Sequence, residues 1–353
     1  PPIPAIRLLI RHAPATSGAA PPPKAGRRAK APFTPSSDPE QRSKAMQSLP
    51  HEFGLTALSV LTRDSAPHPA RIRRETLVLD GTWSLSVDGA PTQPVQVPFA
   101  PQARVNAIPV PEGEARLRYA TAFELPSGWE GALLHFEGVD REAEVSLNGV
   151  ALGRHAGAWD PFSFWVPPAV LRRGLSGGGT TLHALVVEAR DDSRDRSILA
   201  GKQERTAGEG VIFYGNMAGI WKSVWIERAG PRRIASHRLD ADSSGRLTLD
   251  ACVAGRPEGH RLRLTLAHPD GDGALSAEAP VRDGRARIEA VMPGVRPWSP
   301  GSPDLYLGRL SLLDGRGEEV DGFDTYAGFR DFRLDGGWYR LNGRPFHPRG
   351  LLN

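Results

Sequence analysis

The sequence has very little cysteine and no long apolar run. Cys252 is the single cysteine among 353 residues, which excludes an intrachain disulfide framework and a zinc site built on cysteine ligands. No stretch approaches the roughly 20 apolar residues of a membrane helix, and the short apolar run at 6–10 is interrupted by Arg7. We therefore expect no membrane partner. With no visible signal peptide, we place the protein in the cytoplasm.

Beyond its first 45 residues the chain also lacks an excess of positive charge. The whole sequence has 44 Lys and Arg against 40 Asp and Glu, a net charge of +4. Eight of the basic and two of the acidic residues fall within positions 1–45, so 36 basic and 38 acidic residues remain in the rest. Binding to a phosphate backbone requires clustered positive charge. Composition therefore gives no argument for a nucleic-acid partner.

Residues 1–45 are rich in Pro, Ala and basic residues and show no apolar periodicity. A segment with so little apolar area cannot offset the entropy of ordering it. We expect this segment to be a disordered basic tail. A basic amphipathic targeting arm is the functional alternative. Because the first methionine is Met46, a third interpretation is that the tail lies outside the natural protein.

Signatures of nucleotide, metal and serine-hydrolase chemistry are missing as well. The sequence has no Walker A loop, HExxH helix, G-x-S-x-G elbow or G-x-G-x-x-G after a strand. Residues 269–278, PDGDGALSAE, superficially resemble a calcium loop at Asp270 and Asp272. The third acidic ligand and the fixed spacing are absent, so a hairpin turn is the preferred interpretation. We expect neither a metal nor a cofactor.

What the sequence contains is β-strand patterning. Glycine (39) and proline (33) are both frequent. The sequence shows no pattern of a long amphipathic helix, which argues against a βαβ or Rossmann fold. Apolar and polar residues alternate with period two over 77–87 and 117–125. In EVSLNGVAL, residues 144–152, Asn148-Gly149 supplies the two positive-φ residues of a type I′ hairpin. Residues 220–227 carry apolar side chains on both faces, which predicts one central strand of a sandwich.

A second set of short strands begins near Ile234, after Ala229-Gly230-Pro231. Its strands, separated by Gly, Asp and Pro turns, are spaced as in an immunoglobulin-like sandwich of about 100 residues. After residues 328–330, GFR, one more hairpin remains, with Asn342-Gly343 at its turn.

Two segments carry polar or aromatic groups suited to sugars. Residues 188–203, EARDDSRDRSILAGKQ, follow a buried strand and include Asp191 and Asp192. Carboxylate oxygens accept hydrogen bonds from sugar hydroxyls, although composition alone favours a solvated, self-paired charge cluster. Residues 157–167, GAWDPFSFWVP, suggest an aromatic platform for sugar stacking, but their alternation favours a core strand. From motifs alone, the chain reads as a multidomain β protein, with carbohydrate binding as one interpretation.

In their order, these segments resemble the N-terminal half of glycoside hydrolase family 2, the β-galactosidase, β-glucuronidase and β-mannosidase family. The resemblance extends from about Pro69 to the end of the chain. It rests on the following stretches: LVLDGTWSLSVDG (77–89), VPFAPQ (97–102), LLHFEGVDREAEVSLNGVALGRHAGAWDPFSFWV (133–166), GIWKSVWIE (219–227), PWSPGSPDLYLGRLSL (297–312) and GFRDFRLDGGWYRLNGRPFHPRGLL (328–352).

The resemblance implies an all-β chain: a jelly-roll, galactose-binding-like sandwich over 46–229 and an immunoglobulin-like sandwich over 230–330. Residues 331–353 would be the first strands of a truncated (β/α)8 barrel, a domain of about 250 residues. In this family both catalytic glutamates belong to that barrel, so no catalytic residue carries over to this chain. The full protein would hydrolyse O-glycosidic bonds of β-glycosides by a retaining mechanism. The chain alone is predicted to be inactive, with the missing barrel and a β-glycoside as partners.

The sugar-binding residues that carry over are few. Asp191 or Asp192 falls where some family members extend a carboxylate towards the sugar, and Lys202-Gln203 resembles a Gly-Lys-Gln element of some subgroups. Many members read Arg-Gly-x-Asn at the first barrel strand. Here Asn353 stands one place later, which puts in question its role as a substrate contact.

Two alternatives stay open. A stand-alone carbohydrate-binding module would bind sugar without catalysis, and a structural interaction module would do neither. If a barrel is missing, apolar surface near 346–352 would be left open. We then expect poor solubility, self-association or a homo-oligomer.

Overall fold

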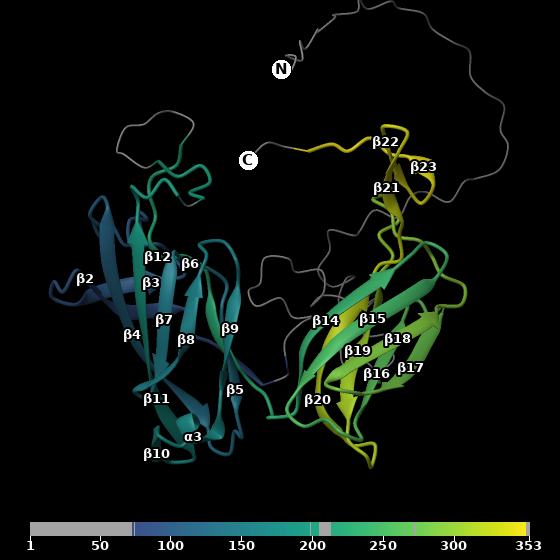
Figure 1. The fold of residues 1–353 in the computed structure, drawn as a ribbon, viewed down its shortest axis with the longest axis horizontal. Helices are drawn as coiled ribbons and strands as arrows, with labels where there is room; N and C mark the ends of the chain where they lie inside the picture. The colour runs from purple at the N-terminus through teal and green to yellow at the C-terminus, as the bar shows by residue number, and fades with distance from the viewer. Residues whose placement is uncertain (1–72, 74, 198, 205–212, 272, 351–353) are drawn as a thin grey trace, which may run out of the picture. The chain divides into compact units, whose positions relative to one another are not determined.

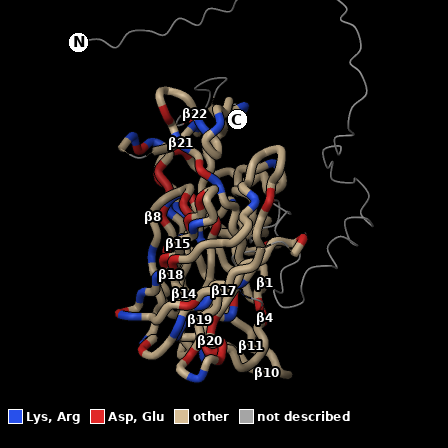
Figure 2. The backbone as a smooth tube through the Cα atoms, turned by 90° about the vertical axis from the view of Figure 1, so that its right-hand side faces the viewer, with Lys and Arg blue, Asp and Glu red and all other residues tan. Residues whose placement is uncertain are grey.

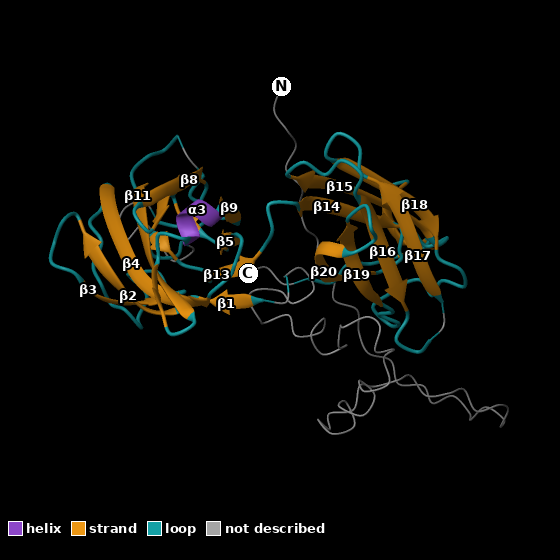
Figure 3. Cartoon of the chain, turned by 90° about the horizontal axis from the view of Figure 1, so that it is seen from below, coloured by secondary structure: helices purple, strands orange, loops and turns teal. Residues whose placement is uncertain are grey.

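The computed structural model describes residues 73, 75–197, 199–204, 213–271 and 273–350. Within them the fold is built almost entirely of antiparallel strands (Figure 1), and the short helix α3 (Pro168–Leu171) is drawn in purple in Figure 3. No helix in this described part is long and apolar enough to cross a membrane. The tail predicted for 1–45 lies outside these residues.

Two sheets face each other to form the first sandwich. The smaller has the strand order β1-β13-β5-β9, and the larger has the order β3-β2-β4-β11-β7-β8 with β10 beside β11. A two-stranded sheet, β6 with β12, completes this part. The bounds are β1 (Thr76–Val78), β2 (Gly81–Val87), β3 (Gln93–Val97), β4 (Glu114–Pro126), β5 (Ala132–Phe136), β6 (Val139–Asp140), β7 (Glu142–Leu147), β8 (Val150–Ala156), β9 (Phe162–Val166), β10 (Leu175–Gly177), β11 (Thr180–Asp192), β12 (Gly219–Ile220) and β13 (Val224–Arg228).

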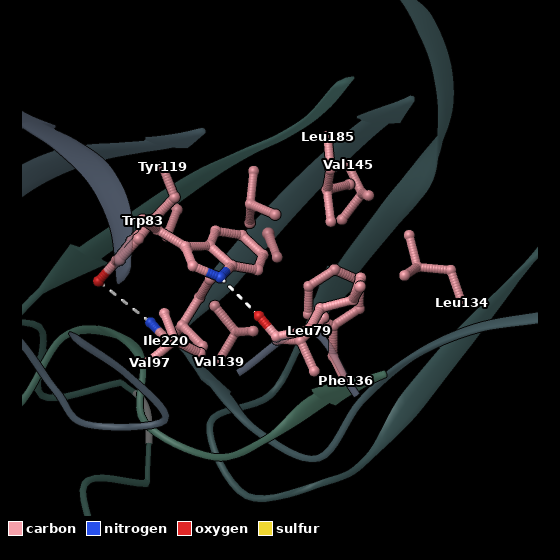
Figure 4. Packing of buried hydrophobic residues seen from close by; sticks show 14 of the residues in the cluster. Leu79, Trp83, Val97, Tyr119, Leu134, Phe136, Val139, Val145, Leu185 and Ile220 are labelled. Atoms are coloured by element: carbon pink, nitrogen blue, oxygen red, sulfur yellow. Dashed lines mark hydrogen bonds between the residues drawn. The ribbon is translucent and has the colours of Figure 1, made fainter. Parts of the chain in front are cut away.

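The core of this sandwich is formed by the apolar residues whose alternation is visible in the sequence (Figure 4). Leu134 and Phe136 of β5 meet Val145 of β7 and other buried side chains of the larger sheet. One buried polar group of this core has its partner close by: the Trp83 indole N–H donates to the Leu79 carbonyl at 2.8 Å. A polar group buried with a hydrogen-bond partner costs less free energy of folding than one buried without a partner.

The predicted hairpin at Asn148-Gly149 is confirmed. Leu147 pairs with Val150, and the two turn residues have φ of 52° and 75°. Phe162, Phe164 and Val166 lie in β9 and pack against the core, as the alternation predicts.

The single central strand predicted over 220–227 is wrong in one respect, because the structure divides it. Ile220 pairs with Val139 in the small sheet, whereas Val224 pairs with Phe136. Between them the Trp221 indole donates to the Ala158 carbonyl at 2.9 Å. The chain therefore changes partner at 221–223. Only β13, between β1 and β5, is the central strand.

The second sandwich pairs a three-stranded sheet, β14-β15-β18, with a four-stranded sheet, β17-β16-β19-β20. Its own cluster of buried residues includes Leu249, Leu264 and Tyr306. The segment with Asp270 is the turn between β16 and β17, in agreement with the hairpin interpretation. The bounds are β14 (Arg233–Ala241), β15 (Arg246–Ala254), β16 (Arg261–Ala267), β17 (Ala274–Pro280), β18 (Arg285–Val291), β19 (Tyr306–Leu313) and β20 (Glu319–Ala327).

A small terminal sheet follows, made of β21 (Phe332–Asp335), β22 (Trp338–Leu341) and β23 (Arg344–Pro345). Its large apolar side chains are open to solvent: Phe332 is 53%, Leu334 66% and Trp338 68% exposed. Residues 346–350 are not in a strand. The predicted first strands of a barrel are therefore not confirmed.

One buried ion cluster, centred on Arg73, joins residues far apart in the sequence. The Arg73 guanidinium donates to Asp321 Oδ1 and Oδ2 at 2.6 and 2.8 Å and to Glu227 Oε1 at 2.7 Å. All three side chains are at most 8% exposed. Such charges are tolerated in the interior only when they are paired and hydrogen-bonded.

Candidate functional site

The two predicted carboxylates are the last residues of β11, the long strand at the centre of the larger sheet. Asp191 pairs with Ala115 and Asp192 with Glu114. Successive side chains of a strand point to opposite faces, so the two carboxylates differ. Asp191 is buried, with 7% exposure, whereas Asp192 is half-buried and its Oδ1 accepts from the Arg194 N–H at 3.0 Å.

A third carboxylate, Asp140, belongs to the same site and was missed by sequence reasoning. It ends β6 and is 5% exposed. Its partner across the small sheet is Gly219, which has φ of +76° and whose Cβ, if present, would lie 2.1 Å from the Tyr119 hydroxyl. Only glycine fits this position, because both the backbone conformation and the available space exclude a side chain.

Gln203 fixes the position of Asp140. Its amide Nε2 donates to Asp140 Oδ2 at 2.7 Å, and its Oε1 accepts from the Met217 N–H at 2.7 Å. Gln203 is itself buried. The Gly-Lys-Gln element therefore supplies the glutamine as a support of the acidic group, while Lys202 is exposed.

Electrostatics distinguishes Asp191 from the other carboxylates. Burial first, and then the negative charge of Asp140, raise the pKa of Asp191 to about 7. Burial also raises the pKa of Asp140, against the opposing effects of Gln203 and Arg141. The positive charge of Arg141 lowers the pKa of both carboxyl groups. This compensation is partial, because Arg141 also pairs with Asp195 at 3.3 Å. Near neutral pH, Asp191 can therefore both donate and accept a hydrogen bond.

These groups line one small hollow at the end of the sandwich. Its walls come from β6, from the end of β11 and from the loop that follows. The lining residues are Asp140, Asp191, Asp192, Ser193, Asp195, Leu199, Ala200, Gln203, Glu204 and Asn216. At about 20 Å³ the hollow has room for about one water molecule, so a sugar could meet these groups only at its mouth. Asp191 and Asp192 thus both border this hollow, while Asn353 lies outside the described residues.

A larger hollow covers the outer face of the bigger sheet, but its charges are already paired. Arg154 contacts Glu144 at 2.9 Å, Arg190 contacts Glu114 at 3.1 Å, and Arg118 approaches Glu188 at 3.5 Å. Figure 2 shows basic and acidic residues interspersed along the chain. This face behaves as a solvated ladder of ion pairs. Among the residues that can be described, no group of three or more His, Cys, Asp or Glu could hold a metal ion.

Consecutive antiparallel sandwiches with an acidic hollow place the chain in the class of multidomain β-sandwich proteins. Residues 233–330 match the family model described as glycosyl hydrolases family 2. The resemblance noted from the sequence is thereby confirmed, and over these residues the chain is similar to the enzymes of that family.

Named relatives point the same way. A β-galactosidase from Aeromonas hydrophila is 28% identical over 254 residues, which cover 66% of this chain and 22% of that protein. A β-glucuronidase from Paenibacillus borealis is 24% identical, with 79% of this chain and 49% of that protein covered. The chain therefore spans about half or less of the length of these relatives.

Solved structures share the fold. The structure of Bifidobacterium dentium β-glucuronidase complexed with coumarin-3-O-glucuronide superposes with a TM-score of 0.59 at 22% identity and covers 78% of this chain and 51% of that one. A β-galacturonidase from Eisenbergiella tayi gives a TM-score of 0.55 at 20% identity, with coverages of 77% and 46%.

Proposed function

We propose that the chain is the N-terminal, non-catalytic part of a retaining β-glycosidase, and that its acidic hollow forms part of the sugar site. The observation that carries this proposal is the group of Asp140, Asp191 and Asp192 at the end of the first sandwich. Buried carboxylates supported by an amide are suited to accept hydrogen bonds from sugar hydroxyls. The β-galactosidases, β-glucuronidases and β-galacturonidase among the similar proteins suggest a β-galactoside or a β-uronide as the substrate.

The terminal sheet supports the presence of a further domain. Phe332 stacks on Tyr339 with ring centroids 5.4 Å apart, and both rings are about half exposed. Grouped apolar side chains of this kind usually mark a surface covered by another protein part. We assign that role to the catalytic barrel, which would follow the two sandwiches divided as predicted at 229 and 330. A homo-oligomer and a cytoplasmic location stay predictions.

The physical reason for expecting no hydrolysis by this chain lies in what the hollow offers. A retaining mechanism needs an acid that protonates the leaving group and a nucleophile about 5 to 5.5 Å away on the other side of the bond. Asp140 is held by Gln203 and faces inward. Asp191 and Asp192 can orient a sugar, but they supply no free nucleophile opposite an acid. These carboxylates are therefore binding groups.

A second candidate function is a carbohydrate-binding module that is complete without a barrel. A third outcome, hydrolysis by the chain itself, would require Asp191, whose pKa is raised to about 7 by burial and then by Asp140, to act as the acid. The three possibilities differ in what residues 46–353 do by themselves.

The test is a panel of chromogenic β-galactosides, β-glucuronides and β-mannosides. It is applied to residues 46–353 and to the same polypeptide extended along its reading frame. Hydrolysis by the longer protein alone supports the proposal and names the sugar. Hydrolysis by 46–353 that Asp191→Asn abolishes would replace it with a catalytic role for Asp191. If neither protein hydrolyses any substrate but 46–353 binds sugar, the binding module is the correct interpretation.

A further inference from the structure

An exposed tryptophan lies beside the acidic hollow. Trp159 belongs to the loop between β8 and β9 and is 42% exposed, and it is not a member of the hydrophobic core. The loop is tied to the site because the Gly157 N–H donates to the Arg141 carbonyl at 2.9 Å, next to Asp140 in the chain. The half-exposed indole ring of Trp159 offers a large apolar surface next to a polar hollow.

The turn that carries Gln203 is shaped to fit Trp159. Gly201 has φ of +58°, and a Cβ at this position would lie 3.2 Å from Trp159 Cζ2. The neighbours Ala200 and Gln203 line the acidic hollow. A glycine here both adopts the left-handed conformation and allows the turn to approach the indole ring. The ring and the hollow therefore share one wall.

Trp159 is also held on a second side. Its ring makes an edge contact with Trp221, with centroids 5.2 Å apart and planes at 74°. Trp221 is fixed in turn, since its indole N–H donates to the Ala158 carbonyl and the Lys222 ammonium lies 4.4 Å from its ring. The loop is thus braced from both directions, and the half-exposed indole is held in place. Little conformational entropy is lost when a ligand contacts a pre-organised aromatic group.

We propose that Trp159 is a stacking platform for the pyranose ring whose hydroxyls bond to Asp191 and Asp192. The inference rests on the proposed function and adds a residue to its sugar site. A pyranose presents apolar C–H groups on its faces and hydroxyls around its edge. The first match an aromatic surface and the second match carboxylates, the combination of apolar wall and few polar groups that defines a ligand site.

The experiment measures binding of methyl β-D-galactopyranoside and methyl β-D-glucuronide to the full chain by calorimetric titration. We expect Trp159→Ala to weaken binding of the preferred sugar about three- to tenfold, from the usual strength of aromatic contacts. Trp159→Phe should retain most of the affinity. The matched control is Trp338→Ala, which removes an exposed tryptophan of the terminal sheet and should change the affinity less than about twofold.

A second measurement tests stacking directly. Sugar binding should shift the tryptophan fluorescence of the natural chain, and Trp159→Phe should remove that shift. The Asp192→Asn variant separates the proposed sugar site at the acidic hollow from the proposed stacking on Trp159. If Asp192→Asn weakens binding and Trp159→Ala does not, the stacking inference is wrong and the acidic site stands. If neither variant weakens binding, or if the natural chain binds neither sugar, both are wrong.

Discussion

Replacing Asp191 by asparagine is expected to stabilise the chain at alkaline pH and to leave its stability unchanged in acid. The folded protein holds a proton on Asp191 up to about pH 7, whereas the unfolded chain releases it near the ordinary value of 3.8. Between these values the native state binds more protons, so stability falls as pH rises. Burial of the ionised Asp191 therefore lowers the free energy of unfolding by its full amount above pH 7, and has no effect below about pH 4, where the group is protonated in both states.

The magnitude follows from the same two values. The interval between 3.8 and about 7, at about 1.4 kcal/mol for each tenfold change in proton affinity, corresponds to about 4 kcal/mol. The hollow is open to solvent, and screening reduces the expected effect to about 2 kcal/mol. The substituted asparagine keeps the size of the side chain and carries no charge, so the Asp191→Asn variant should be more stable than the natural chain by this amount at pH 8.

The assay is urea denaturation followed by tryptophan fluorescence, at a series of pH values from 4.5 to 8. Asp140 and Arg141 face the same carboxylate and are unchanged in the variant. Asp192→Asn removes the same charge at the neighbouring, half-buried position and is the matched control, which should stabilise the chain less at pH 8 because its side chain is less buried. A difference between Asp191→Asn and the natural chain that is constant with pH, or that is absent at pH 8, would refute the reasoning.

Two further predictions concern stability. Arg73→Ala should destabilise the chain by about 3 to 5 kcal/mol, because it leaves two buried carboxylates without their partner; Arg228→Ala, at an exposed pair, should cost less than about 1 kcal/mol. An equal effect of the two in urea denaturation would contradict the assigned role of burial. Gly308→Ala should prevent correct pairing of β16 with β19, since its Cβ would lie 1.7 Å from the Thr265 carbonyl oxygen. Gly301→Ala, with nothing within 4 Å, is the control, and both are read from thermal unfolding.

Local features of the fold could be predicted well from the sequence. The Asn148-Gly149 and Asn342-Gly343 turns have the positive φ values that their residues favour, and the alternation of apolar residues marked most strands and the core. The division of 220–227 could not be foreseen, because it depends on two different partner strands. Periodicity within one segment carries no information about such a change of partner.

The site was predictable only in part. Asp191 and Asp192 were predicted as sugar contacts because they come at the end of a buried strand, and Gln203 was noted because it resembles a Gly-Lys-Gln element; their binding of sugar stays a prediction. Asp140 was not predicted as a member of this hollow, because a Val-Asp pair inside an apolar segment has the pattern of an ordinary β-strand. The signal that identifies it is its contact with Gln203, 63 positions away. Contacts over such separations arise from the tertiary fold, and the Arg73 cluster is hidden from local patterns for the same reason.

The bridge made by Gln203 has a consequence for engineering. One side-chain amide joins the end of β6 to the backbone at Met217, so three separate stretches of sequence define one geometry. Grafting residues 188–203 onto another sandwich would transfer the carboxylates of β11 without the two partners that this amide requires. The graft would carry the composition of the hollow and lose its shape. Any redesign of specificity must therefore move all three stretches together.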